Sequence, residues 1–373
     1  MKLLTILGAR PQFIKAATVS REIRNYNESH VKKIEEVIIH TGQHFDASMS
    51  DIFFEQLDIP LPDHNLGISS LGHGAMMGRM VEIIEEIIKK EKPDWVLVYG
   101  DTNSTLAGAL ASVKIHVPVA HVEAGLRSHN LAMPEEVNRA LTDRVSSVLF
   151  CPTRTAELNL RQEGYPFSVP TYKKQRILNT GDVMFDATLF YKEKAHKNYK
   201  LDKWGLTEKN YVLCTLHRAE NTDNPDRLKS IFTALRIINE EVSVVLPLHP
   251  RTRNLVFEQG GKEWIKGLNI LEPVSYLEMQ RMEMSAYAIL TDSGGIQKEA
   301  YFHRVPCLTM RDETEWVETI EAGWNQLVGS GFKKITNTFK NIKEPNTVDA
   351  KQIYGDGQSA LKILDELLKI NNL

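Results

Sequence analysis

The sequence predicts an α/β protein with two doubly wound parallel sheets, and three observations support this fold class. Short apolar runs alternate with segments of helical periodicity along the whole chain. Most of these runs are continuously apolar, which is typical of strands buried on both faces of a parallel sheet. At 373 residues, the chain is also longer than one hydrophobic core normally supports, so we expect two Rossmann-like domains.

The strands are predicted in two series, separated by segments with apolar residues three or four positions apart. The first series is residues 2–7, 37–41, 95–99, 118–122, 148–151 and 176–180. The second series is residues 211–215, 243–247, 268–271, 287–291, 306–310 and 325–328. Residues 76–90 are typical of the helical segments, and residues 359–370 are predicted as a last amphipathic helix with Ser359 as its N-cap. Its predicted apolar face is Leu361, Leu364, Leu367 and Leu368.

Composition and charge exclude several classes of function. The net charge is -3, so the chain lacks the basic footprint of a nucleic-acid-binding protein. No apolar run approaches the roughly 20 residues of a membrane-spanning helix, and the first run is too short for a signal peptide. No Cys/His spacing resembles a metal site. The 3 cysteines are expected to be buried and reduced. We therefore predict a cytoplasmic protein with no metal and no membrane or nucleic-acid partner.

Polar, glycine-rich and charged residues gather at the carboxyl ends of the predicted strands. They occupy residues 8–12, 42–44, 100–103 and 123–127 in the first half, and 217–221, 249–251, 292–295 and 311–313 in the second. Open α/β sheets bind ligands at this edge. We therefore expect one active site, in a cleft where the two sheet edges face each other.

The most readable motif is residues 292–299, Asp-Ser-Gly-Gly-Ile-Gln-Lys-Glu, which joins a strand to a helix. Gly294 and Gly295, next to Ser293, would let backbone N–H groups approach a phosphate at the helix N-terminus. Glu299 lies early in the helix, where its carboxylate would accept hydrogen bonds from a ribose diol. A plain helix cap with a solvated carboxylate is the simpler alternative. The motif is not a Walker A sequence, because no Gly-Lys-Ser/Thr follows.

Cations lie at the same predicted edges. Arg10 and Lys15 flank the first helix opening, and His217 and Arg218 follow a strand of the second series. Together they would neutralise a diphosphate leaving group without a metal. Any one of them alone would more often be a solvated surface cation.

Carboxylates at the edge of the first series are the candidates for proton abstraction from a carbon atom. They are Asp101, Glu123 and Glu135. Crowding and partial burial bring a carboxylate toward the proton affinity that this chemistry needs. Glu135 and its neighbour Glu136 have an alternative as first-turn helix acids. His121 is expected to be a satisfied core histidine.

With these motifs assembled, the sequence resembles the non-hydrolysing UDP-N-acetylglucosamine 2-epimerase family over nearly its whole length. The matching motifs lie at residues 8–15, 100–102, 121–127, 134–139, 217–221, 249–251, 292–299, 310–312 and 354–357. The resemblance implies a GT-B fold, a homodimer, no cofactor, and a C-terminal helix that crosses back to the first domain.

Domain limits follow from the residues and the resemblance together. The charged, strand-free stretch 191–210 is the predicted junction. An N-terminal Rossmann-like domain with the acid–base residues is expected at 1–185 plus 358–373. A C-terminal Rossmann-like domain that binds UDP is expected at 186–357.

Within the family, the sequence most resembles UDP-2,3-diacetamido-2,3-dideoxyglucuronate 2-epimerases, at residues 8–15, 99–105 and 314–318. Enzymes acting on UDP-N-acetylglucosamine typically have Glu where this chain has Gln12, and Arg-Pro where it has Trp316 and Val317. An amide in place of an acid suits an anionic sugar, and Trp316 would reshape the sugar pocket. Epimerisation of UDP-N-acetylglucosamine is the alternative. The family's allosteric Gln-His-Arg-Glu stretch is changed here to Gln-His-Phe-Asp at residues 43–46, which puts activation by a second substrate molecule in doubt.

The family implies a mechanism that these residue types suit. The C2 proton of such a sugar is not beside a carbonyl, so its acidity must come from loss of UDP at C1. Anti elimination would give a 2-acetamidoglycal, and UDP would add back after reprotonation on the other face. The predicted catalytic residues are Asp101, Glu123, Glu135 and His217. The predicted substrate-binding residues are Arg10, Lys15, Arg139, Arg218, Met279, Ser293, Gly294, Gly295, Glu299 and Trp316, with Met279 near the uracil.

Three other activities would use the same nucleotide site. A GT-B glycosyltransferase would need an acceptor groove and no cluster of carboxylates. A hydrolysing epimerase would release free sugar and UDP. A non-catalytic UDP-sugar sensor would have no use for three acid–base candidates together.

Overall fold

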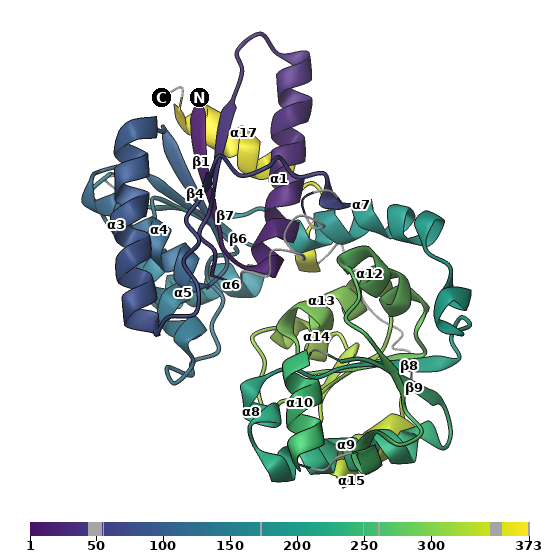
Figure 1. The fold of residues 1–373 in the computed structure, drawn as a ribbon. Coiled ribbons are helices and arrows are strands. Elements are labelled where there is room, and N and C mark those ends of the chain that lie inside the picture. The colour runs from purple at the N-terminus through teal and green to yellow at the C-terminus, as the bar shows by residue number, and fades with distance from the viewer. Residues whose placement is uncertain are drawn as a thin grey trace. The chain divides into compact units, whose positions relative to one another are not determined.

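The computed structural model describes residues 1–43, 54, 56–171, 174–248, 250–259, 262–343 and 353–371. The chain divides into two compact units, Met1–Ala187 with Lys351–Leu373, and Thr188–Ala350 (Figure 1). Each unit contains one parallel sheet. The domain limits predicted from the sequence were 185/186 and 357/358, whereas the units divide at 187/188 and 350/351.

The predicted junction at residues 191–210 is wrong, because this stretch belongs to the second unit. Its first part continues helix α7 (Val183–Asn198), and the short 3-10 helix η1 (Leu201–Trp204) follows. Tyr191 and Ala195, four positions apart on α7, are fully buried. The charged residues between them therefore indicate the outer face of a packed helix, and they do not mark a linker.

The first unit has a 7-stranded sheet in the order β3-β2-β1-β4-β5-β6-β7. Its strands are β1 (Lys2–Leu7), β2 (Glu35–His40), β3 (His64–Asn65), β4 (Trp95–Tyr99), β5 (Val119–Val122), β6 (Val148–Cys151) and β7 (Arg176–Asn179). Its helices, besides α7, are α1 (Arg10–Ser29), α3 (His73–Glu91), α4 (Asn103–Lys114), α5 (Pro134–Val145), α6 (Arg154–Gln162) and α17 (Ser359–Asn371). The sequence did not predict β3, because a strand of two residues carries no apolar run.

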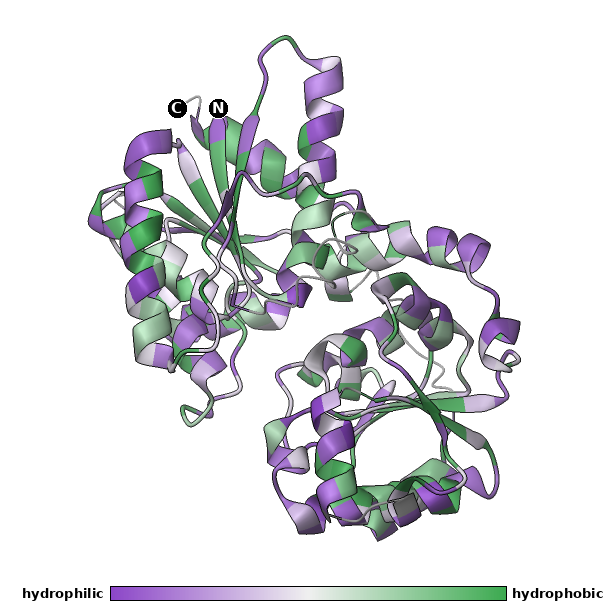
Figure 2. Cartoon of the chain, viewed as in Figure 1, coloured by the Kyte–Doolittle hydropathy of each residue, from purple (hydrophilic) through white to green (hydrophobic). Residues whose placement is uncertain are grey.

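The core of the first unit forms between the sheet and the apolar stripe of each covering helix. Met80 and Ile84 of α3 pack against Leu4 and Val98 of the sheet, and all four are fully buried. Figure 2 shows the strands in the colours of apolar residues, with polar residues on the outer helix faces. The predicted helix at 76–90 is confirmed, with its start three residues earlier at His73.

The C-terminal helix α17 belongs to the first unit, as the family resemblance implied. Its buried residues are Ser359, Ala360, Ile363, Leu364, Leu367 and Ile370. Leu361, predicted on the apolar face, is 39% exposed. Ala360 and Ile363 complete the buried stripe at helical spacing and turn Leu361 outward. The start of α17 is tied to α7, since Asp186 Oδ2 accepts the Ala360 N–H at 2.8 Å.

The second unit has a 6-stranded sheet in the order β10-β9-β8-β11-β12-β13. Its strands are β8 (Tyr211–Thr215), β9 (Ser243–Pro247), β10 (Asn269–Leu271), β11 (Ala288–Thr291), β12 (Cys307–Thr309) and β13 (Asn325–Leu327). Its helices are α8 (Ala219–Thr222), α9 (Pro225–Asn239), α10 (Pro250–Gln259), α11 (Lys262–Ile265), α12 (Tyr276–Ser285), α13 (Gly294–His303), α14 (Val317–Glu321) and α15 (Phe332–Lys340).

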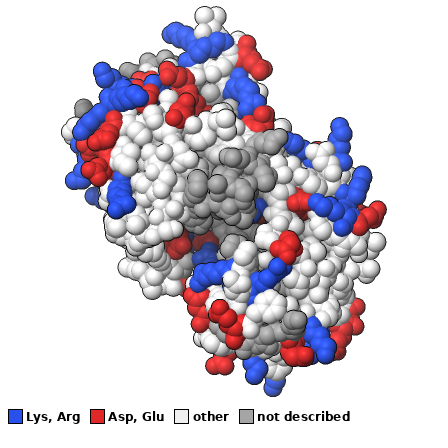
Figure 3. Space-filling view, in the orientation of Figure 1, with Lys and Arg blue, Asp and Glu red and all other residues white. Residues whose placement is uncertain are grey.

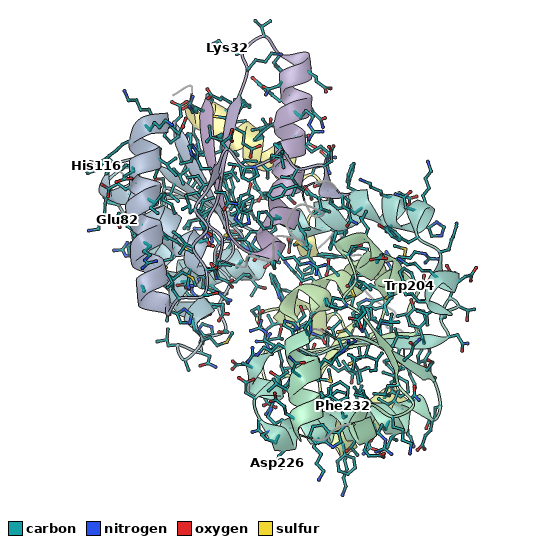
Figure 4. All side chains as sticks on the ribbon, in the orientation of Figure 1. Lys32, Glu82, His116, Trp204, Asp226 and Phe232 are labelled. Carbon is teal, nitrogen blue, oxygen red and sulfur yellow. The ribbon has the colours of Figure 1, made fainter. Side chains whose placement is uncertain are left out.

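Two apolar layers enclose the second sheet. One contains Val212 of β8 with Phe232 of α9 and Ile335 of α15, and Phe232 is labelled in Figure 4. The other contains Leu213 of β8 with Met282 of α12. Neighbouring residues on β8 thus point to opposite layers, as the pleat of a strand requires. This explains why the run is continuously apolar.

Several features of composition can now be placed in the structure. Cys151, Cys214 and Cys307 are buried free thiols, as predicted. Basic and acidic side chains lie side by side on the face shown in Figure 3. Among the residues that the structure describes, none of the helices is both long and apolar enough to cross a membrane. The same part of the chain contains no group of three or more His, Cys, Asp or Glu side chains that could hold a metal ion.

Candidate functional site

Helix α1 and the loop after β5 bring two predicted residues together at the carboxyl edge of the first sheet. Lys15 Nζ of α1 lies 2.5 Å from Glu123 Oε1, and the two side chains are only 8% and 7% exposed. Gly100 has φ +63°, and a methyl group at this position would lie 3.2 Å from Lys15 Nζ and 3.5 Å from Glu123 Oε1. A side chain at position 100 would therefore meet this buried ion pair. In this structure the Lys15 ammonium, predicted to contact a diphosphate, neutralises Glu123.

Asp101 is held by α5. Its Oδ2 lies 2.5 Å from Arg139 Nη2, and its side chain is 28% exposed whereas that of Arg139 is 4% exposed. Arg139 Nη1 also lies 3.1 Å from Glu136 Oε2. Asn138 Nδ2 donates to the Asp101 carbonyl oxygen at 3.0 Å. Arg139 therefore orients the Asp101 carboxylate, and its contact with substrate stays a prediction.

The two acids at the start of α5 have different environments. Glu136 is 2% exposed and accepts hydrogen bonds from Ser128 N–H, Ser128 Oγ–H and His129 N–H at 3.0, 2.9 and 3.1 Å. Glu136 therefore holds the loop before the helix. Glu135 is half-buried, and no hydrogen bond or ion pair of its carboxylate occurs within the described residues. Of the pair, only Glu135 has a carboxylate available for chemistry.

His121 is a satisfied core histidine, as predicted. Its Nδ1 lies 2.7 Å from Asp143 Oδ1, and its Nε2 lies 2.7 Å from the Gly100 carbonyl oxygen. Both His121 and Asp143 are fully buried. The sequence did not identify Asp143, because one acid late in an amphipathic helix is a common surface feature.

Gln12, expected to shape the sugar pocket, is buried beneath the first loop and is only 1% exposed. Its Oε1 accepts the N–H groups of Gly8 and Ala9 at 2.8 and 3.0 Å. Its Nε2 donates to the Tyr99 carbonyl oxygen at 2.8 Å. The expectation is therefore corrected: the Gln12 side chain reaches back over the first turn of α1 and fixes the loop between β1 and α1. Arg10, at the start of α1, remains partly exposed.

In the second unit, Asp292 joins the loops after β8 and β11. It accepts hydrogen bonds from His217 N–H at 3.2 Å, Arg218 N–H at 3.0 Å and Asn221 Nδ2–H at 3.3 Å. Burial alone would raise the pKa of Asp292, but the hydrogen bonds and the His217 side chain hold it below the usual range. The His217 Nδ1 lies 3.2 Å from Asp292 Oδ1, and its ring is half exposed. A buried anion thus holds the His217 ring and the backbone N–H of Arg218.

The helix α13 begins as the sequence predicts for a phosphate site. Ser293 is its N-cap, without a side-chain capping bond. A methyl group on Gly294 would lie 2.5 Å from Glu315 Oε1 and 3.4 Å from Trp316 Nε1, so the Glu315 carboxylate would have to move. A methyl group on Gly295 meets only Ser293 Oγ, at 3.9 Å, among the described residues. The backbone at Gly295 therefore has room on this side for an anionic ligand.

Glu299 lies in a buried network with residues that the sequence did not single out. Gln280 Nε2 donates to Glu299 Oε1 at 2.8 Å and to Glu283 Oε2 at 3.1 Å. His303 Nε2 lies 2.7 Å from Gln280 Oε1. Burial, with a smaller effect of two lysines, lowers the pKa of His303 to about 3, so its ring is neutral and this nitrogen donates. The carboxylate predicted to meet a ribose is thus held by the Gln280 amide. Met279, predicted near the uracil, is partly buried against the adjoining core.

Trp316, predicted to line the sugar pocket, is 4% exposed. The Lys298 ammonium lies 3.8 Å from the centroid of its ring, and Lys298 is 1% exposed. Thr314 Oγ1 accepts the Trp316 N–H at 3.1 Å. Trp316 therefore covers a buried cation close to the start of α13, and its contact with the sugar stays a prediction.

Each unit contains residues that suit one part of a possible reaction. The first unit provides carboxylates held by cations, which suits proton transfer. The second provides a glycine-rich helix start with His217 and Arg218 at the same sheet edge, which suits a diphosphate. That the two edges face each other stays a prediction.

Comparisons with known proteins show which family the chain resembles. The family model described as UDP-N-acetylglucosamine 2-epimerase matches residues 27–368. The chain is 52% identical over 371 residues to the UDP-2,3-diacetamido-2,3-dideoxy-D-glucuronate 2-epimerase of Pseudomonas aeruginosa, covering 99% of this chain and 100% of that protein. It is 50% identical over 374 residues to a UDP-N-acetylglucosamine 2-epimerase homolog of Methanococcus maripaludis, covering 98% and 99%. The crystal structure of Methanocaldococcus jannaschii UDP-GlcNAc 2-epimerase in complex with UDP-GlcNAc and UDP is similar, with a TM-score of 0.87, 42% identity and coverage of 99% and 100%.

Proposed function

We propose that this chain, which belongs to the UDP-N-acetylglucosamine 2-epimerase family, inverts C2 of a UDP-2-acetamido sugar. The observation that carries the proposal is the buried Lys15–Glu123 pair against Gly100, next to Asp101. A glycosyltransferase or a UDP-sugar sensor would have no use for carboxylates gathered at this edge. No cofactor takes part in the proposed reaction.

The proposed reaction has two balanced steps. A carboxylate removes the C2 proton while the C1–O bond breaks, and the electron pair of that bond leaves with the UDP diphosphate. The C–H electrons form the C1–C2 double bond of a glycal. A proton is then delivered to the opposite face of C2, and the diphosphate oxygen adds back to C1. UDP has to stay bound between the two steps, which requires a strong nucleotide site.

Roles follow for the described residues. Asp101, Glu123 and Glu135 are the proposed proton carriers, and Glu135 has the carboxylate with most freedom. In the second unit, the backbone at Gly295 and the half-exposed His217 ring would stabilise the diphosphate as its charge develops. Glu299 would accept the ribose hydroxyls, with Met279 near the uracil.

For the substrate we propose UDP-2,3-diacetamido-2,3-dideoxyglucuronate. The support is the 52% identity to an enzyme named for that sugar. The alternative is UDP-N-acetylglucosamine, since a 42% identical relative from Methanocaldococcus jannaschii is named for it.

NMR of the purified protein with each UDP-sugar in deuterated buffer tests the proposal. The expected result is a C2 epimer that carries solvent deuterium at C2, formed faster from the diacetamido glucuronate. Epimerisation without deuterium would contradict proton transfer. Release of free sugar and UDP would indicate a hydrolysing enzyme, and an unchanged UDP-sugar would favour a transferase or a sensor. Turnover of UDP-N-acetylglucosamine alone would overturn the substrate assignment.

We also propose a homodimer that works in the cytoplasm. Val137 and Leu141, four positions apart on α5, are 38% and 47% exposed, and nearby Leu131 is 73% exposed. Such a stripe suits burial against a second copy. Light scattering should give twice the chain mass of 42.4 kDa. Leu141→Lys should give a monomer, whereas Leu158→Lys on α6, at a position 41% exposed, should leave the dimer intact. The nucleotide-sugar substrate and the buried thiols support the cytoplasmic location.

A further inference from the structure

Asp143, near the end of α5, uses both carboxylate oxygens to hold the loop that carries Glu123. It is fully buried. Its Oδ1 lies 2.7 Å from His121 Nδ1, and its Oδ2 accepts the Gly125 N–H at 3.1 Å and an Arg127 Nη1–H at 2.8 Å. Burial by itself would raise the pKa of Asp143, but the His121 and Arg127 contacts outweigh burial and hold it below its usual range. Asp143 is therefore an anion inside the first unit.

His121 extends this contact to the loop that carries Asp101. Its Nε2 lies 2.7 Å from the Gly100 carbonyl oxygen. A carbonyl oxygen only accepts hydrogen bonds, so Nε2 carries a hydrogen. Since Nδ1 faces the ionised Asp143, this nitrogen carries a hydrogen as well. His121 is thus a double donor that links the α5 carboxylate to the peptide immediately before Asp101.

Both loops need such support because their backbones are unusual. Glu123 has φ +75°, a left-handed conformation that strains a residue with a side chain. The hydrogen bond from Gly125 N–H to Asp143 closes this turn two residues later. Gly100 has φ +63°, and a methyl group at this position would lie 3.2 Å from Lys15 Nζ and 3.5 Å from Glu123 Oε1. A shift of either loop would therefore change the separation of the proposed proton carriers.

We infer that Asp143 and His121 are a positioning pair, which sets the placement of Asp101 relative to Glu123 without touching substrate. The inference rests on the proposed function, because only that function makes the separation of these carboxylates matter. Misplacement of a reacting group by about 1 Å costs roughly 10²-fold in rate. Loss of the link should therefore lower kcat while the KM for the UDP-sugar changes little, since the proposed UDP contacts lie in the second unit.

Two substitutions of similar size distinguish the hydrogen bonds of His121 from the packing of its ring in the core. In His121→Gln the amide nitrogen reaches the place of Nε2, so it still donates to the Gly100 carbonyl oxygen. In His121→Asn the shorter amide reaches only the place of Nδ1, so it meets Asp143 and leaves Gly100 without its donor. Both remove the ring. A larger loss of kcat in His121→Asn than in His121→Gln therefore shows that the contact to Gly100 contributes more than the contact to Asp143.

Gln175→Leu is the matched control for the stability of α5. Gln175 is 3% exposed, and its Nε2 donates to the carbonyl oxygens of Asp143 and Ser146 at 2.8 and 2.7 Å. It therefore anchors the same end of the helix without touching the Asp143 carboxylate. The three variants and the wild type are compared in kcat, KM and the midpoint of urea unfolding.

The expected result is a kcat about 10- to 100-fold lower for His121→Asn. His121→Gln should stay within about tenfold of the wild type, Gln175→Leu within about threefold, and all KM values within about threefold. Equal losses of kcat for His121→Asn and Gln175→Leu at matched stability would overturn the inference. A loss confined to KM would overturn it too.

Hydrogen exchange distinguishes failure of this inference from failure of the proposed function. If the wild type epimerises neither UDP-sugar, the proposed function has failed. Hydrogen exchange then still tests the contacts of His121 with Asp143 and Gly100. His121→Asn should then speed the exchange of amides in residues 100–102, and Asp143→Ala those in 123–125 as well. Unchanged exchange at both loops would overturn the positioning pair.

Discussion

The buried Lys15–Glu123 pair makes a prediction about stability that can be worked out from the structure. The side chains are 8% and 7% exposed, with Nζ and Oε1 2.5 Å apart. Lys15→Met removes the cation and leaves a carboxylate in a site that excludes water. Loss of one partner from a buried ion pair typically costs about 3–5 kcal/mol of unfolding free energy.

Protonation sets a ceiling on this loss. A buried carboxylate that has lost its cation takes up a proton. For a glutamate of ordinary pKa, this protonation costs about 4 kcal/mol at pH 7, and the cost falls by about 1.4 kcal/mol for each pH unit below 7. The free energy of unfolding of Lys15→Met should therefore be lower than that of the wild type by up to about 4 kcal/mol at pH 7 and by about 1 kcal/mol at pH 5. The sign follows because the variant binds a proton on folding, which becomes easier as the pH falls.

The assay is urea unfolding followed by far-UV circular dichroism at pH 5, 6 and 7. The control is the double variant Lys15→Met/Glu123→Gln, which carries neither charge and should recover about 1–3 kcal/mol relative to Lys15→Met at pH 7. Both variants should be inactive. A loss below about 1 kcal/mol at pH 7, or an equal loss at pH 5 and pH 7, would refute a buried and mutually neutralised pair.

Three further predictions follow from single positions. Asp186→Asn should stabilise the protein by up to about 3 kcal/mol at pH 8 and by little at pH 4 in urea titrations. Burial raises the pKa of Asp186 to about 6, so the stability it contributes is lost as the pH rises through that value; an equal gain at both pH values would contradict this. Gly294→Ala should weaken UDP binding at least about tenfold by calorimetry, because the methyl group would lie 2.5 Å from Glu315 Oε1 and displace the loop; an unchanged Kd would argue against this nucleotide site. Asp292→Asn should lose about 1–3 kcal/mol of unfolding free energy at pH 7, because its amide hydrogens would face the His217 N–H. Since the pKa of Asp292 is held low, the gap to the wild type should close below about pH 4, and a gap that persists there would speak against an ionised Asp292.

Most of the fold could be predicted because its signals are local. Strands buried on both faces are continuously apolar, and β4, β6, β8 and β9 begin and end where the sequence predicts. The predictions failed where the sequence pattern does not reflect which residues are buried. The two-residue β3 has no pattern, the charged outer face of α7 resembled a linker, and α17 is rotated so that Leu361 is exposed.

The candidate site was predicted in outline but not in its contacts. Residues 8–15, 100–103 and 292–299 were identified as candidate site segments because glycines and charged residues that follow an apolar run can be recognised in the sequence alone. Gln12 and Trp316 were expected in the sugar pocket, yet both are buried. The type of a residue in the sequence does not show which way its side chain points.

By itself, the sequence determined the two parallel sheets and the strand ends that carry chemistry. Apolar periodicity and the backbone requirements met by glycine are properties of neighbouring residues, so they can be read from the sequence before the fold is known. Only the tertiary structure decided which charge meets which. Lys15 and Glu123 are 108 positions apart, and Asp143 reaches both Gly125 and, through His121, Gly100. These pairings depend on the order of the strands and on burial, because a charge that leaves water must meet a partner wherever the fold brings one.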